Sequence, residues 1–284
     1  MPPLPHHAGS ADSCAMTAIA LSIAGSDSAG GAGIQADLKT FAALGVHGAT
    51  ALTALTAQNT LGVEAVHVVP PDFVLAQMKA VARDLEVAAI KIGMLATSAV
   101  IEAVAAGLKQ FPDVPVVLDP VMVAATGAVL LDNEAIATLK RVLLPQAVVV
   151  TPNLPEAAQL LGTHEARGED EMRAQAHELK RLGAKAVLIK GGHAKGPMAV
   201  DLLLDQEGEM RLEAPRVQTK HDHGTGCTLS SAIAAELAKG ATLRKAVRTA
   251  KAYVTASIAA ADELHSGKGR GPVHHFHAVW PRKA

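Results

Sequence analysis

The chain has 284 residues, of which 49% are hydrophobic and 19% are charged, so it can bury a sizeable core and is not of the intrinsically disordered class. A formal net charge of −1 and an aromatic content of 2% exclude the basic field and the base-stacking side chains typical of nucleic-acid-binding proteins. Because no segment approaches the roughly 20 uninterrupted apolar residues of a membrane span, we expect no membrane association.

Apolar runs alternate with helical patterns after an N-terminal extension. Residues 1–17 lack the basic start and long apolar run of a signal peptide, so we expect a flexible extension followed by a single domain over 18–284. Strands are predicted at 19–25, 48–57, 64–69, 88–95, 114–119, 147–151, 184–190, 199–205 and 209–217. Helices are predicted from the glycine turn at 25–33 to Leu44, and over 71–85, 98–110, 132–143, from about 155, 168–182, 227–239 and 242–262.

This alternation predicts an α/β fold. Strands rich in Val and Ile between helices of about 10–15 residues are typical of a central, mostly parallel sheet with helices on both faces. The two cysteines, Cys14 and Cys227, are too few to suggest a disulfide framework, so we expect a reducing, cytoplasmic setting.

A glycine-rich turn follows the first predicted strand. The segment 31–36 (GAGIQA) matches a dinucleotide-binding fingerprint, but that fingerprint also needs an acidic residue about 20 positions later to hold a ribose. The corresponding segment, 49–60, contains no acidic residue, which disfavours a nicotinamide-dependent oxidoreductase. A tight strand-to-helix turn and a turn that admits a small ligand both remain open.

A second glycine motif, Gly224-Thr225-Gly226-Cys227, opens the Ala- and Leu-rich helical pattern near residue 227. Backbone N–H groups at such a helix start, with the positive end of the helix dipole behind them, form an anion site. The same field favours the thiolate of Cys227, which would place a proton acceptor beside the anion. A plain helix cap with a buried cysteine is the structural alternative.

Polar residues also follow several predicted strands, where α/β proteins collect ligands. Gln58 can offer both an acceptor and donors to an aminopyrimidine-like edge, Met94 can form an apolar wall, and Asp119 can organise hydrated Mg²⁺. Each has a structural alternative: Gln58 in a loop turn, Met94 in the core, and Asp119 as a turn-starting residue.

Three further polar residues lie later in the chain. Asn153 and Glu156 are three positions apart at a helix start, which is also the pattern of a capping box. Lys190 ends a predicted strand and can reach a phosphate or stay solvated. The run His274-His275-Phe276-His277 is not assigned to a metal, because no Cys or carboxylate cluster lies near it in the sequence.

In their order and spacing, these motifs resemble one family, the hydroxymethylpyrimidine/phosphomethylpyrimidine kinases of thiamine biosynthesis. The resemblance covers the chain from about Ala18 onward, in the segments AGSDSAGGAGIQADLKT (24–40), ALTAQNT (54–60), KIGML (91–95), LDPVM (118–122), TPNLPEA (151–157), IKGGH (189–193), HGTGCTLS (223–230) and GPVHHFH (271–277).

The resemblance implies a ribokinase-like fold and a homodimer that uses MgATP. It implies phosphorylation of 4-amino-5-hydroxymethyl-2-methylpyrimidine and then of its monophosphate to the diphosphate. It also assigns Gln58 to the pyrimidine ring and its amino group, with Gly25 and Met94 framing the ring and Asp37 nearby.

At the phosphoryl site, the resemblance implies that Gly224, Thr225 and Gly226 form the anion hole and that Cys227 stands where related sugar kinases place an aspartate base. Asp119, Asn153 and Glu156 would organise Mg²⁺ and its waters, with Asp119 and Glu156 binding through water, and Lys190 would lie near the nucleotide.

A thiol has an ordinary pKa of about 8.5, so Cys227 needs help from its surroundings to act as a base. The segment 24–33 and the loop VMVAATGA (121–128) are the candidate lids for the second phosphorylation.

Two rival functions are compatible with the sequence: a pyridoxine or pyridoxal kinase of the same superfamily, and a pyrimidine-binding module without activity. The intact Gly-Thr-Gly-Cys run and the acidic residues argue against the second rival, because binding alone needs no phosphoryl site.

Overall fold

The computed structural model describes residues 17–122, 130–192 and 196–281. Within these ranges nine strands form one sheet in the order β3-β2-β1-β4-β5-β6-β7-β8-β9. The six strands from β2 to β7 in that order run parallel, whereas β3, β8 and β9 are antiparallel to their neighbours. The strands are β1 (Ile19–Asp27), β2 (His47–Asn59), β3 (Gly62–Val68), β4 (Val87–Ile92), β5 (Val116–Leu118), β6 (Val149–Val150), β7 (Val187–Lys190), β8 (Met198–Asp205) and β9 (Gly208–Pro215).

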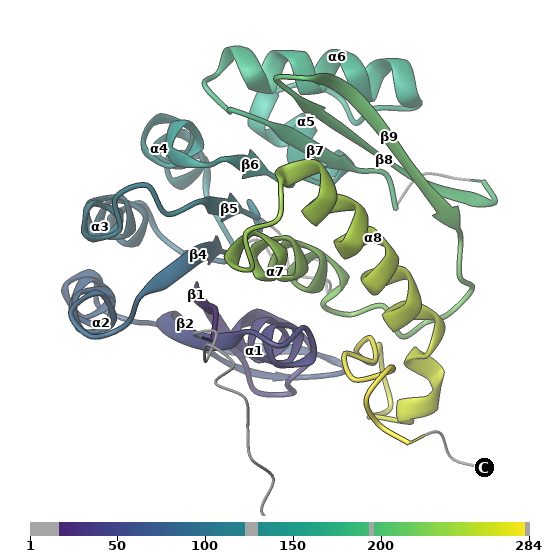
Figure 1. Cartoon of the computed structure of the whole chain (residues 1–284), viewed down its shortest axis with the longest axis horizontal. Coiled ribbons are helices and arrows are strands. Elements are labelled where there is room, and N and C mark those ends of the chain that lie inside the picture. Colours follow the sequence, from purple (N-terminus) through teal and green to yellow (C-terminus); the bar gives the residue numbers. More distant parts are fainter. Residues whose placement is uncertain (1–16, 123–129, 193–195, 282–284) are drawn as a thin grey trace, which may run out of the picture.

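Helices cover both faces of this sheet (Figure 1). On one face, α2 to α6 pack on the sheet through an apolar cluster that includes Met78, Ile101 and Leu139. On the other face, α1, α7 and α8 pack through a second cluster that includes Phe41, Ile233 and Val254. The helices are α1 (Gly33–Ala43), α2 (Pro71–Ala82), α3 (Ser98–Gly107), α4 (Asn133–Val142), α5 (Leu154–Leu161), α6 (Glu169–Arg181), α7 (Thr225–Ala238) and α8 (Leu243–Ala259). The predicted α/β fold with a mostly parallel, doubly covered sheet is therefore confirmed.

Two element boundaries differ from the prediction in ways that affect the site. Strand β2 continues past residue 57 to Asn59, because Gln58 and Asn59 pair with Val63 and Gly62 of β3. Gln58 is thus held in a strand and not in a loop. Helix α7 begins at Thr225 and not at Cys227, so Cys227 occupies the third position of the helix.

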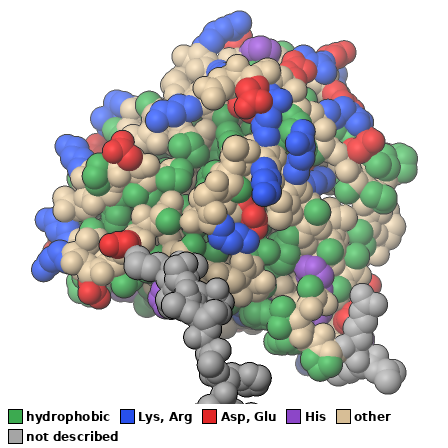
Figure 2. All heavy atoms as spheres, viewed as in Figure 1, with side chains coloured by type: hydrophobic (Ala, Val, Ile, Leu, Met, Phe, Trp, Pro, Cys, Tyr) green, Lys and Arg blue, Asp and Glu red, His purple; other side chains and the backbone are tan. Residues whose placement is uncertain are grey.

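The surface shows no single charged field on the face in Figure 2, where acidic and basic side chains lie interspersed. None of the described helices is long and apolar enough to cross a membrane. Most of the expected extension (residues 1–16) and most of the second candidate lid (residues 123–128) lie outside the described residues.

Candidate active site

One large cavity of about 720 Å³ opens at the carboxyl ends of the parallel strands and extends to the first turn of α7. This is the edge at which open α/β sheets bind ligands. The structure brings together here every site residue predicted from the sequence except Asp37. The lining includes Gly25, Gln58, Met94, Asp119, Asn153, Glu156, Lys190, Gly224, Thr225, Gly226 and Cys227.

The start of α7 forms the base of the cavity. Gly224 has a φ of +79°, and a Cβ there would lie 1.9 Å from the Gly31 carbonyl oxygen, so both the backbone conformation and the space require glycine. No side chain of the described residues caps this helix, although the Thr225 N–H donates to the Asp222 carbonyl oxygen at 3.3 Å, so the first turn offers its remaining N–H groups to an anion. A Cβ on Gly226 would lie 3.2 Å from Lys190 Nζ, so the lysine stands next to the same turn.

Asp119, Lys190 and Glu156 form a charged cluster beside that turn. Lys190 Nζ lies 2.8 Å from Asp119 Oδ1 and 3.7 Å from Glu156 Oε2. The Thr151 hydroxyl donates to Asp119 Oδ1 at 3.1 Å, and the Ser230 hydroxyl, which also contacts the Gly226 carbonyl oxygen at 2.9 Å, lies 3.2 Å from Asp119 Oδ2. Burial opposes the charged form of Asp119, but Lys190 and Lys91 together hold the pKa of Asp119 below its ordinary value.

Glu156 has two roles in this cluster. Its backbone N–H donates to Asn153 Oδ1 and its carboxylate accepts from the Asn153 N–H, so the predicted alternative of a capping box is present at the start of α5. The same carboxylate faces Lys190. Burial, with a contribution from the charge of Asp119, raises the pKa of Glu156 to about 7 although Lys190 opposes the shift.

Cys227 lies at the cavity wall, but its thiol does not ionise as the helix position suggests. Burial raises its pKa to about 11, and the nearby Asp37 and Asp119 act in the same direction. Lys91 and a hydrogen bond from the Gly33 N–H lower the pKa, but by less than burial raises it. The expectation that the thiolate is favoured is therefore wrong, because desolvation by burial exceeds the lowering of the pKa by Lys91 and the Gly33 N–H.

Asp37 is not in the cavity wall. It is fully buried, and Lys91 Nζ contacts both of its carboxylate oxygens at 2.9 Å. Ser22 and Ser231 each donate a hydroxyl to it at 2.6 Å. Asp37 was predicted near the substrate ring; the structure places it behind the cavity lining, where it anchors the ammonium of Lys91, a residue that does line the cavity.

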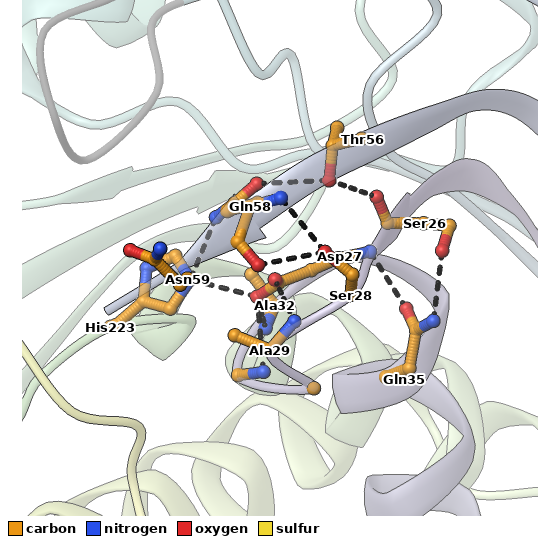
Figure 3. A network of polar contacts seen from close by, with 12 residues as sticks. Ser26, Asp27, Ser28, Ala29, Ala32, Gln35, Thr56, Gln58, Asn59 and His223 are labelled. Atoms are coloured by element: carbon orange, nitrogen blue, oxygen red, sulfur yellow. Dashed lines mark hydrogen bonds and ion pairs between the residues drawn. The ribbon is translucent and has the colours of Figure 1, made fainter. Parts of the chain in front are cut away.

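The far end of the cavity carries the predicted ring-binding residues. A Cβ on Gly25 would lie 3.2 Å from Met94 Sδ, so this glycine and this methionine face each other closely. The Gln58 amide lies between Thr56 and His223, at 3.2 Å from the Thr56 hydroxyl and from His223 Nε2 (Figure 3).

Asp27 and His223 are cavity residues that the sequence analysis did not assign. The Asp27 carboxylate accepts the backbone N–H groups of Ala29, Gly31 and Ala32 and lies 2.9 Å from His223 Nε2. An Asp followed by a cluster of glycines, as in 27–33, was the available signal for such a turn. The His223 contact joins residues 196 positions apart and has no local signal.

The C-terminal histidines have structural contacts. His275 Nε2 lies 3.1 Å from the Thr228 hydroxyl, and His277 Nδ1 lies 3.2 Å from the Ser257 hydroxyl. Among the described residues no group of three or more His, Cys, Asp or Glu side chains is placed to hold a metal ion.

Comparison with known proteins gives the family of this chain. Residues 27–274 match the family model of phosphomethylpyrimidine kinase. A hydroxymethylpyrimidine/phosphomethylpyrimidine kinase of Rhizobium meliloti is 60% identical over 265 residues, which cover 93% of this chain and 99% of that protein.

Solved structures agree on the fold. A Bacillus subtilis pyridoxal kinase in complex with ADP has a TM-score of 0.85 and 41% identity, covering 92% of this chain and 98% of that one. A phosphomethylpyrimidine kinase from Clostridium difficile has a TM-score of 0.74 and 42% identity, covering 84% and 97%. These similarities confirm the ribokinase-like fold, and the chain belongs to the phosphomethylpyrimidine kinase family.

Proposed function

We propose that this protein uses MgATP to phosphorylate 4-amino-5-hydroxymethyl-2-methylpyrimidine and then converts the monophosphate to the diphosphate, as a step of thiamine diphosphate biosynthesis. One observation supports this most directly. A single cavity joins the Gln58 amide at one end to the uncapped start of α7 and the Asp119–Lys190–Glu156 cluster at the other.

The chemistry of the cavity suits transfer of a phosphoryl group to an alcohol. Gln58 pairs with the ring, and Gly25 and Met94 lie against its faces. The backbone N–H groups of Gly224 to Gly226 hold the transferred phosphoryl group, which gains most from positioning and charge neutralisation. Cys227 lies next to them and receives the hydroxymethyl proton, provided that ligand binding lowers the pKa of its thiol.

The donors at the other end fit a nucleotide and Mg²⁺. Mg²⁺ usually retains several waters and binds through one or two carboxylates together with substrate phosphates, and Asp119 and Glu156 provide two buried carboxylates near Asn153. Lys190 provides a cation for the phosphates. When bound, MgATP supplies the phosphoryl group, and the apolar side chains of Val217, Val254 and Ile258 offer its base a surface at the β9–α8 side of the cavity.

A pyridoxal kinase remains the second candidate, because the Bacillus subtilis enzyme of that name is highly similar in structure. A time course by mass spectrometry separates the two, with MgATP and either hydroxymethylpyrimidine or pyridoxine in separate tubes. We expect the pyrimidine monophosphate to appear first and the diphosphate to follow. Phosphate on pyridoxine alone would move the protein to the second candidate, and unchanged ATP in both tubes would favour a binding module.

We further propose that residues 18–284 work as one domain, that the active form is a cytoplasmic homodimer, and that no partner other than small molecules is needed for turnover. The support is the family to which the chain belongs. Sedimentation velocity of the purified protein at the concentration of the activity assay tests the dimer, and a single species at 29.1 kDa would contradict it.

A further inference from the structure

The Gln58 side-chain amide has two polar neighbours, one of which needs a hydrogen-bond acceptor and the other a donor. The first is His223, whose Nε2 lies 2.9 Å from Asp27 Oδ2. Asp27 accepts three backbone N–H groups, and its pKa lies below the ordinary value: burial raises it, but hydrogen bonds from His223 and the backbone lower it further. An ionised carboxylate only accepts, so His223 Nε2 carries the hydrogen and acts as a donor.

The second neighbour is Thr56. Its hydroxyl donates its one hydrogen to the Ser26 carbonyl oxygen at 2.8 Å. Toward Gln58, 3.2 Å away, the Thr56 oxygen can therefore only accept.

Only one orientation of the Gln58 amide satisfies both neighbours. Its carbonyl oxygen belongs on the His223 side and its NH₂ on the Thr56 side. In Figure 3 the nitrogen lies toward His223 and the oxygen toward Thr56, which sets two donors against each other at 3.2 Å. Half a turn of the amide exchanges the two atoms without moving anything else and removes this clash: the amide oxygen then shares the Nε2 hydrogen of His223 with Asp27, and the NH₂ donates to the Thr56 oxygen.

His223 is held firmly enough to impose this direction. A Cβ on Gly31 would lie 2.6 Å from His223 Cδ2, so the ring packs closely on the glycine turn. The His223 backbone bonds to that of Gly271 and Val273, and its side chain is only 11% exposed.

The orientation of the Gln58 amide determines which hydrogen-bonding edge of a pyrimidine ring can pair with it. We propose that the Asp27–His223 pair fixes the direction of the Gln58 amide and thereby makes the cavity select a 4-aminopyrimidine edge over a 4-oxopyrimidine edge. The selected edge has an amino donor beside a ring-nitrogen acceptor, which match the amide oxygen and NH₂. The 4-oxo edge has a carbonyl acceptor beside an N–H donor, which meet the wrong ends of the amide. His223 acts as a positioning residue, and the inference rests on the proposed function.

The test compares kcat/KM for hydroxymethylpyrimidine and for its 4-oxo analogue. We expect the unaltered protein to prefer the amino compound by about 100-fold or more, because a site built to pair with a polar group rejects a mispaired analogue. In His223→Leu only the Thr56 oxygen still orients the amide, so the preference should fall below about tenfold. His223→Gln places an amide N–H near the position of His223 Nε2 and should restore most of the preference for the amino compound.

A purely structural role for His223 predicts a different result. The Leu variant would then lose kcat/KM equally for both compounds and keep the ratio, which overturns the proposal. A preference below about tenfold in the unaltered protein overturns it too. If the Leu variant does not fold, His223→Asn, with a shorter polar side chain, replaces it with the same two outcomes. Failure of the proposed function is distinct, because the unaltered protein would then not phosphorylate the amino compound.

Discussion

Lys190 and Asp119 form an ion pair in the cavity wall, with Nζ 2.8 Å from Oδ1 and side chains only 12% and 1% exposed. Glu156, 3.7 Å from the same ammonium, is also buried. One cation thus faces two carboxylates. Burial disfavours the charge of Lys190, but Asp119 and Glu156 raise the pKa of Lys190 above its ordinary value, so it is charged near neutral pH.

Replacing Lys190 by Met should destabilise the protein without ligands by about 3–5 kcal/mol, because two buried carboxylates lose their cation. Urea unfolding measures this difference. Arg141→Met is the control, since Arg141 pairs with Glu102 on the surface with both side chains more than half exposed, and its loss should cost less than about 1 kcal/mol. Equal effects of the two substitutions would contradict the role given to the cavity cluster.

The raised pKa of Glu156 predicts a pH dependence of stability. Its folded-state pKa of about 7 lies above the ordinary value of 4.5, so the folded state binds more protons than the unfolded state between these values. Stability from this group is therefore present at low pH and is lost as the pH rises from about 4.5 through about 7. The loss amounts to roughly 3 kcal/mol for a shift of this size.

The measurement is the free energy of unfolding against pH for the unaltered protein and for Glu156→Gln. The difference between the two curves isolates Glu156 from His275, whose pKa burial lowers to about 3 and which gives the opposite slope at acid pH. A difference that stays constant from about pH 4.5 to 8 would show that Glu156 titrates normally.

Gly224→Ala should abolish the anion site. Its Cβ would meet the Gly31 carbonyl oxygen at 1.9 Å, so the glycine turn or α7 must shift, and phosphoryl transfer should fall by at least about 100-fold. Gly240→Ala is a matched control, since Gly240 has a φ of +83° and no atom within 4 Å of its Cβ position. This control tests backbone strain alone, and we expect it to lose about 1–3 kcal/mol of stability and to keep its activity. Equal activities of the two variants would refute the argument.

The sequence predicts the layers and most of the site because both follow from local patterns. Alternating strands and helices require a mostly parallel sheet, and polar residues at strand ends then meet at one edge, as Asp119 and Lys190 do. The position of Gln58 was harder to predict from the sequence. Its polar neighbours resemble a loop, and only pairing with β3 draws this segment into β2.

Contacts between distant segments could not be predicted from spacing. Lys91 and Asp37 are 54 positions apart, and nothing near Asp37 in the sequence shows that four donor contacts would bury it. The ionisation of Cys227 is a similar case. Its helix position is visible in the sequence, but the desolvation that dominates its pKa depends on the whole packing around it.

The pKa of Cys227 gives the last prediction. In the protein without ligands the thiol should react slowly with iodoacetamide near neutral pH, and the rate should rise until about pH 11, because the thiolate is the nucleophile. Peptide mass spectrometry separates Cys227 from Cys14. A midpoint at or below about 8.5 would show that the helix dipole prevails over burial.

The same residue bears on catalysis. If Cys227 accepts the hydroxymethyl proton, Cys227→Ser should lower turnover by about 100-fold or more in both steps. A serine variant with full turnover in both steps would leave Cys227 no role as a base. Phosphoryl transfer would then depend on positioning by the first turn of α7 and on the charges of Lys190 and Asp119. Positioning and charge neutralisation contribute more to transfer onto an alcohol than a strong base does.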